Sequence, residues 1–155
     1  MEIRLAKESD IEDIKSLLLQ IDLIHNDIRP DIFKRNALKY NNYDLIEIIN
    51  NPLTPIFVYC DNNKVIGHCF TQIIEIKNNN VLQDVKTLYI DDLCVDKNNR
   101  GNHIGKKLYD YVINYAKSIK CYNVTLNVWA GNDKALSFYE SLGLKPQKTY
   151  MEKIL

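Results

Sequence analysis

The sequence predicts an α+β fold with a mixed, mostly antiparallel sheet flanked by helices. Three observations lead to this prediction. An amphipathic helix pattern follows the first short strand, two strand-like segments flank the turn Asp61-Asn62-Asn63, and strand and helix patterns then alternate. A short polar turn favours an antiparallel hairpin, whereas a helix between two strands favours a parallel pair. Since 155 residues suffice for one hydrophobic core, we expect a single domain over residues 1–155.

The N-terminal part should form one strand and then helices. Residues 2–6 alternate like a strand, and Ser9 with Glu12 has the pattern of a capping box that opens a helix. An apolar stripe from Ile11 to Ile21 marks one face of that helix. Pro30 suits the first turn of a second helix over about residues 31–38, and a third is expected at 43–49.

The rest of the chain should supply most of the sheet. We expect strands at 56–60, 64–76, 82–95, 123–129 and 149–154, and helices at 104–119 and 133–142. Three asparagines from Asn78 interrupt the chain before the longest of these strands. Gly143 stands where a glycine that ends a helix belongs.

Composition excludes several classes of protein. Lysine plus arginine and aspartate plus glutamate number 20 each, so nothing in the net charge favours nucleic acid or an anionic membrane as partner. The longest apolar runs are too short to span a bilayer, and the N-terminus reads as a strand rather than a signal peptide. The four cysteines lack metal-ligand spacing and lie in or beside apolar segments, which favours reduced thiols, a cytoplasmic location and no metal.

The most informative segment begins at Asp91-Asp92 and ends in the helix that starts near Ile104. It reads as a strand, a polar loop and a glycine-containing turn. Free backbone N–H groups at the start of a helix and the helix dipole make such a turn suited to phosphate. Positive side chains at Arg100 and Lys106 add to this, and adjacent carboxylates suggest that the phosphorylated cofactor meets an amine.

A second motif narrows the choice of cofactor. The chain has neither the Gly-Lys-Ser/Thr of a P-loop nor Gly-x-Gly-x-x-Gly. Residues 100–105, Arg-Gly-Asn-His-Ile-Gly, resemble the coenzyme A pyrophosphate loop of the GNAT N-acetyltransferases, and 132–144 are similar to that family's later Asn-x-x-Ala-x-x-x-Tyr-x-x-x-Gly-Phe segment. The resemblance is densest from Tyr89 to Leu144. His103 departs from the family's first loop glycine; we expect a helical conformation there, with the imidazole facing solvent rather than acting in catalysis.

The resemblance implies an acetyl-CoA site and an acid. It implies that acetyl-CoA contacts two groups of residues: the strand-end backbone of Leu93, Cys94 and Val95, and the loop Arg100, Gly101, Asn102, His103, Ile104, Gly105 and Lys106. Asn132 should both cap the next helix and contact the cofactor. Tyr139, two turns further along, is implied to protonate the leaving thiolate, although plain core packing would also explain it. No metal is implied.

A base should accompany that acid, because an alkylammonium with a pKa of ~10 is not nucleophilic. Some family members carry a glutamate five residues before the motif asparagine, where this chain has Asn127. Asp91 is our first choice for the base, directly or through water, and Asp92 should attract the ammonium. Successive strand residues point to opposite faces, so the two could share a face only across a bulge, and either could be an exposed strand end.

The expected activity is acetyl transfer by direct attack of a primary amine, in a small polyamine-like molecule or a protein, on acetyl-CoA. His25 and Arg29 lie where the resemblance places the wall of the acceptor pocket, although an ordinary interhelical loop would also contain them. A non-catalytic acyl-CoA sensor is the alternative function. A homodimer is a further possibility, with neither nucleic acid nor membrane as partner.

Overall fold

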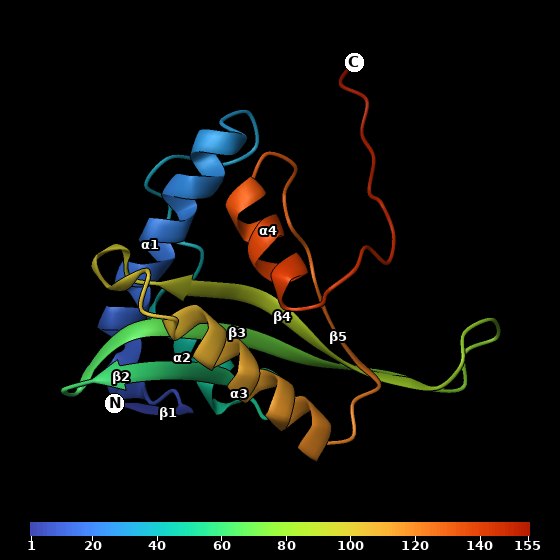
Figure 1. The fold of residues 1–155 in the computed structure, drawn as a ribbon, viewed down its shortest axis with the longest axis horizontal. Coiled ribbons are helices and arrows are strands. Elements are labelled where there is room, and N and C mark those ends of the chain that lie inside the picture. The colour runs from blue at the N-terminus through green and yellow to red at the C-terminus, as the bar shows by residue number, and fades with distance from the viewer.

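The computed structural model describes all residues 1–155 and contains one five-stranded sheet (Figure 1). The strands lie side by side in chain order, with the bounds β1 Glu2–Leu5, β2 Ile56–Asp61, β3 Lys64–Ile76, β4 Val85–Val95 and β5 Asn123–Leu126. All neighbouring strands are antiparallel except β4 and β5, which are parallel. The predicted mixed, mostly antiparallel sheet is therefore confirmed.

Helices cover both faces of this sheet. Their bounds are α1 Ile11–Ile28, α2 Asn42–Asn50, α3 Ile104–Ser118 and α4 Asp133–Ser141, with short 3-10 turns at Glu8–Asp10 and Lys97–Asn99. Residues of α1 and α2 pack into one buried cluster and residues of α3 into another, with α4 at the edge of the second. We call the two sides of the sheet the α1 face and the α3 face.

The alternation of β2 shows how the sequence builds both cores. Ile56, Val58 and Cys60 point to the α1 face, while Phe57 and Tyr59 point to the α3 face, and all five are buried. A strand that is apolar on both sides fits the centre of a sheet covered on both faces.

The hairpin between β2 and β3 forms as predicted. Asn62 and Asn63 adopt φ values of 48° and 64°, the left-handed conformation that a type I′ turn requires at both central positions. Asparagine tolerates this region better than other residues that carry a Cβ. The expected helix at 43–49 is also confirmed as α2, where Asn41 caps the helix by accepting from the Asp44 N–H at 2.9 Å.

The predicted helix starts need two corrections. Ser9 makes no cap; α1 begins at Ile11, and the Asp10 carboxylate instead accepts from the Lys7 N–H and from the Arg4 guanidinium, both at 2.7 Å. The helix expected at 31–38 does not form, because that segment consists of turns and bends and Asn36 has a φ of 54°, which no α-helix accommodates.

Three strand predictions also differ from the structure. β4 begins at Val85 rather than at residue 82, and β5 ends at Leu126 rather than at residue 129. The expected closing strand at 149–154 is absent, since residues 145–155 have no regular structure and run away from the body of the chain (Figure 1). Its sequence is strand-like, but a strand needs a neighbour to pair with. None of the helices has the combination of length and apolar content needed to cross a membrane.

Candidate active site

A bulge in β4 brings the two adjacent carboxylates to the same face. Phe70 pairs with Asp92 and Thr71 with Ile90, so Asp91 is the extra residue of β4. Leu93 packs on the α3 face, as Ile90 does three residues earlier, which shows that the alternation shifts by one across the bulge. Asp91 and Asp92 therefore both face α1, which is the arrangement that an unbroken strand would forbid.

The same region opens the sheet between β4 and β5. Pairing of these parallel strands ends at Ile90 and Leu126, whereas β4 continues for five more residues to Val95. Beyond that point the chain that follows β5 leaves β4 (Figure 1). Backbone groups of Leu93 and Cys94 on this side thus have no strand beside them, and an extended ligand could pair with them as an added strand would.

The loop before α3 presents free backbone donors. Gly101 has a φ of 84° and His103 a φ of 58°. The first hydrogen bond of α3 runs from the Lys107 N–H to the His103 carbonyl at 3.0 Å, so the N–H groups of Ile104, Gly105 and Lys106 have no acceptor within the helix. Such a helix start, reinforced by the dipole, suits an anion.

The expected helical conformation of His103 is wrong. Its φ of 58° and ψ of 17° are left-handed, a region that costs a residue with a Cβ about 1–2 kcal/mol. Its side chain makes no capping hydrogen bond, so nothing in the helix start depends on the imidazole. What this position contributes to the helix start is therefore its backbone conformation and not its imidazole.

The positive side chains of the loop have protein partners already. Arg100 Nε donates to the Val95 carbonyl at 3.1 Å, and Lys106 Nζ pairs with Asp110 at 2.6 Å, an exposed contact. Asn102 Nδ2 donates to the Asn99 carbonyl at 3.3 Å. Arg100 therefore lies against the end of β4, and the Val95 carbonyl is occupied unless this side chain moves.

Gly105 lies where α3, α4 and β4 come together. A Cβ built there would meet Phe138 Cζ at 3.5 Å and Leu93 Cδ2 at 3.7 Å. These are ordinary contact distances, so one methyl group fits, but a branched side chain would press into the space between the two helices. The constraint at this position is that narrow space rather than the backbone, because no positive φ is involved.

α4 carries the second motif. Asn132 caps this helix, its Oδ1 accepting from the Ala135 N–H at 3.3 Å, as predicted. Tyr139 packs at the edge of the α3 core, and burial raises the pKa of its phenol. No protein group hydrogen-bonds its hydroxyl oxygen, and that oxygen is not sealed from solvent. The phenol is therefore a protonated donor that is free to bond a ligand atom.

The two carboxylates have different surroundings. Asp91 accepts from Lys39 Nζ at 2.7 Å and from the Tyr40 hydroxyl at 3.2 Å. Burial alone would lower the pKa of Lys39, but its contacts with Asp91 outweigh that effect and raise it. Asp92 is buried and its Oδ2 lies 3.2 Å from His68 Nε2. Asp91 thus already holds an alkylammonium, whereas the neighbour of Asp92 is an imidazole nitrogen.

His68 is the residue that sequence reasoning missed. It is fully buried, its Nδ1 has no hydrogen-bond partner, and it lies opposite Cys94 in the pairing of β3 with β4. An unpartnered buried nitrogen is uncommon and costs ~1–3 kcal/mol. Only the register of β3 against β4 could have revealed it, since 24 residues separate His68 from Asp92.

Cys94 does not have the surroundings of a nucleophile. Burial raises the pKa of its thiol to about 12, and its Sγ points to the Leu17 carbonyl at 3.5 Å. Reactive cysteines need a stabilised thiolate in a partly exposed position, which these surroundings do not provide. All four cysteines are free thiols, and no three of the chain's His, Cys, Asp and Glu residues group as metal ligands would.

The end of α1 borders the opening between the strands. The His25 ring centroid lies 5.0 Å from that of Phe33, which in turn lies 5.2 Å from that of Trp129, just beyond β5. Burial lowers the pKa of His25, which favours the neutral imidazole. Arg29 at the end of the helix pairs with Asp31 at 2.7 Å and with Glu152. His25 is thus placed beside the opening, while the Arg29 charge is already paired.

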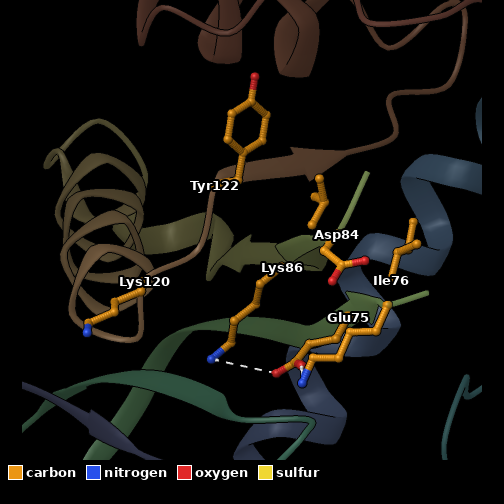
Figure 2. A pocket seen from close by; sticks show the side chains of 8 residues that line it. Glu75, Ile76, Asp84, Lys86, Lys120 and Tyr122 are labelled. Atoms are coloured by element: carbon orange, nitrogen blue, oxygen red, sulfur yellow. Dashed lines mark ion pairs between the residues drawn. The ribbon is translucent and has the colours of Figure 1, made fainter. Parts of the chain in front are cut away.

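Two further features have no assigned part in the site. Asn127 Nδ2 donates to the Tyr89 hydroxyl at 3.1 Å, a structural contact. A surface pocket of about 490 Å³ lies at the other end of β4, lined by Lys86, Glu75 and Asp84 among others (Figure 2). Within it Glu75 forms ion pairs with Lys77 and Lys86, and its lining includes neither Asp91 nor any residue at the start of α3.

Comparison with known proteins identifies relatives of this chain. Residues 20–144 match the model of the acetyltransferase (GNAT) family. The structure of a mutant BH1408 protein from Bacillus halodurans superposes with a TM-score of 0.96 at 32% identity, covering 100% of this chain and 99% of that one. An aminoglycoside N-acetyltransferase in complex with CoA shares the fold, with a TM-score of 0.74 at 14% identity over 99% of this chain and 98% of that one.

A curated relative matches over a shorter region. Glucosamine 6-phosphate N-acetyltransferase of Arabidopsis thaliana is 34% identical over 68 residues, which is 44% of this chain and 44% of the relative. The match therefore spans less than half the length of that protein.

Proposed function

The chain belongs to the acetyltransferase (GNAT) family, and we propose that it transfers an acetyl group from acetyl-CoA to a primary amine by direct attack. The observation that carries this proposal is the juxtaposition of three features. These are the open edge of β4 beyond Ile90, the free N–H groups at the start of α3, and the unpartnered phenol of Tyr139 on α4.

Acetyl-CoA would lie along the opening between β4 and β5. Its pyrophosphate would accept from the N–H groups of Ile104, Gly105 and Lys106, while its amide-containing arm would pair with the backbone of Leu93 and Cys94. The arm would pass between α3 and α4, where the absence of a side chain at Gly105 leaves room in a narrow space. Asn132, at the start of α4, would contact the cofactor from the other side.

Catalysis would need an oxyanion donor and an acid. A backbone N–H near Leu93–Cys94 would stabilise the negative oxygen that forms when the amine attacks the thioester carbonyl; such a donor is worth ~3–4 kcal/mol in other acyl transfers. Tyr139 would give its proton to the sulfur as the carbon–sulfur bond breaks. The buried, weakly acidic thiol of Cys94 supports direct transfer over an acyl-cysteine intermediate.

We assign the carboxylates by their partners. Asp91 would hold the cationic acceptor, because it already holds the Lys39 ammonium at 2.7 Å, which the substrate ammonium would replace. Asp92 would take the proton from the amine, because accepting it breaks no ion pair with a lysine; His68 Nε2, 3.2 Å from Asp92 Oδ2, would hold the carboxyl group in place. Asp91 as the base stays the alternative, and it requires Lys39 to leave first.

The acceptor class that we propose is a cationic primary amine, and both the site and the relatives' names support it. Two carboxylates on one face favour a cationic amine, and His25 beside the opening would border it. Two of the similar proteins are named for amine-bearing sugars. The panel to test is therefore a hexosamine phosphate, an aminoglycoside, a polyamine and a peptide with a free N-terminus.

The test is release of CoA thiol from acetyl-CoA with each amine, with product identified by mass spectrometry. The proposal expects at least one amine to raise thiol release well above the rate without amine. Tyr139→Phe should lose this activity, and Tyr43→Phe, which alters an exposed phenol on α2, should keep it. Tight CoA binding with no turnover on any amine would instead support the non-catalytic sensor.

A further inference from the structure

Lys39 occupies the place that a substrate amine would need. Its Nζ lies 2.7 Å from Asp91 Oδ2, which also accepts from the Tyr40 hydroxyl at 3.2 Å. The same Nζ lies 5.3 Å from the centroid of the Tyr40 ring, a cation–π distance. Since a lysine side chain is itself a primary alkylamine, a residue of the chain here binds as the proposed acceptor would.

The neighbouring Lys34 shows that this contact is particular to Lys39. Both lysines lie in the segment between α1 and α2, where no helix or strand forms. Lys34 is exposed and its side chain makes neither an ion pair nor a hydrogen bond. The Lys39 side chain is 46% exposed, so it can leave and return to Asp91 without unfolding any helix or strand.

Asp92 connects Lys39 with the proposed acid. The bulge in β4 brings Asp92 to the same face as Asp91. Burial is the main cause of the raised pKa of Tyr139, and the Asp92 charge adds to it. The same charge adds to the effect of Asp91 on the pKa of Lys39, against the lowering effect of burial. Because such effects weaken with distance, Asp92 lies close to both the amine and the phenol.

We propose that Lys39 is an acceptor for the chain's own acetyltransferase activity, and that its acetylation frees Asp91 for an external amine. The inference rests on the proposed function. Asp92 takes a proton from Lys39 Nζ, and the neutral nitrogen attacks the thioester carbonyl of acetyl-CoA. The carbon–nitrogen bond forms, the carbon–sulfur bond breaks, and Tyr139 supplies the proton that the leaving sulfur needs. The products are an acetylamide on Lys39 and CoA with a free thiol.

This modification changes the charge of the acceptor site. An acetylated lysine is uncharged, so it no longer forms an ion pair with Asp91. The site then carries one more net negative charge, and a cationic amine meets a carboxylate that is not already neutralised. Unmodified Lys39 therefore competes with the acceptor, and self-acetylation removes the competitor.

The experiment incubates the full-length protein with acetyl-CoA and no amine, and follows the masses of its tryptic peptides. Acetyl groups should accumulate on Lys39, where they also block tryptic cleavage, and only slowly on the exposed Lys34. Tyr139→Phe should slow the reaction at Lys39 by ~10²-fold or more, the size of a general acid's contribution, and leave Lys34 unchanged. Equal acetylation of the two lysines, or no effect of Tyr139→Phe, would indicate spontaneous reaction with the thioester and overturn the proposal.

Thiol release with the amine panel, measured on the same preparation, separates this inference from the proposed function. Thiol release with an amine but no acetyl group on Lys39 would overturn the inference and leave the function standing. Absence of both reactions would overturn both.

A matched set of variants tests the competition for Asp91 without acetyl-CoA. Lys39→Gln removes the charge as acetylation does, Lys39→Arg keeps it, and Lys34→Gln is the control on the same segment. The probe is n-butylamine, the lysine side chain without its backbone, titrated while the Asp91 amide resonance is followed. Lys39→Gln should bind it roughly three- to fivefold more tightly than the parent, the modest gain expected at a partly exposed ion pair, and the other two variants should match the parent. Equal binding by Lys39→Gln and the parent would show that Lys39 does not compete, and would overturn the proposal.

Discussion

Replacing Tyr139 with phenylalanine should separate acetyl-CoA binding from catalysis. The change removes one hydroxyl oxygen that no protein group hydrogen-bonds, so the fold loses no internal partner. We therefore expect the free energy of unfolding to change by less than ~1 kcal/mol. If Tyr139 is the general acid, turnover should fall by a factor of ~10² to 10⁴, which corresponds to about 2.7–5.5 kcal/mol in the activation free energy.

The assay is thiol release at saturating acetyl-CoA and amine, with CoA affinity measured separately by calorimetry. The CoA dissociation constant of Tyr139→Phe should stay within about threefold of the parent, since only the transition-state contact is removed. Because burial raises the pKa of Tyr139, its phenol should stay protonated even near pH 10, the ordinary pKa of a tyrosine. Full turnover by Tyr139→Phe with its best amine would refute the assignment, and a large loss of CoA affinity would point to packing.

Six further substitutions, at five residues, test the remaining parts of the site. Asp92→Asn should lower turnover more at pH 7 than at pH 9, because more of the amine is already free at pH 9. Asp91→Asn should mainly raise the Michaelis constant of the amine. The reverse pattern in the pH–rate profiles of the two variants would restore Asp91 as the base. His103→Gly should leave CoA affinity unchanged and stabilise the fold by up to ~1 kcal/mol in urea unfolding. Glycine adopts the left-handed conformation without strain, and the gain is reduced by its larger loss of backbone entropy on folding. A loss of CoA affinity would show that the imidazole touches the cofactor. Gly105→Val should cost ~1–3 kcal/mol of stability and weaken CoA binding at least tenfold. Gly105→Ala should bind CoA nearly normally, because a single methyl group would lie at an ordinary contact distance of 3.5 Å from Phe138 Cζ. Normal CoA binding by the valine variant would contradict this. Burial lowers the pKa of His25 in the folded chain, so below the unfolded pKa of about 6.5 the unfolded chain binds more protons and stability falls as the pH falls. His25→Gln should make the free energy of unfolding depend less on pH between pH 7 and 5. An unchanged pH dependence would assign the effect to other groups.

Local patterns predicted much of the fold, because the signals for its elements are themselves local. The apolar stripe of α1, the turn at Asn62 and Asn63 and the cap at Asn132 each depend on residues a few positions apart, and all three are confirmed. The segment at 31–38 failed because Pro30 permits a helix start without enforcing one, and the left-handed Asn36 interrupts the segment.

The site was predictable where it is built from one segment and not where it depends on pairing between segments. The order strand, loop and helix around Arg100 and Gly105 could be read directly. The pairing of His68 with Asp92 could not, because it follows from the register of β3 on β4 and from the bulge at Asp91. Nor does the local sequence around His103 show that its backbone is left-handed, since residues with a Cβ seldom adopt that conformation.

The account rests most directly on acetyl-CoA occupying the opening between β4 and β5. Titration of the isotope-labelled protein with CoA, followed through its backbone amide resonances, tests that claim residue by residue. The account predicts saturable shifts centred on the amides of Ile104, Gly105 and Lys106 and on those of Leu93 and Cys94, with acetyl-CoA competing for the same site. No shift at millimolar CoA, or shifts centred on the pocket around Lys86 and Glu75, would contradict it.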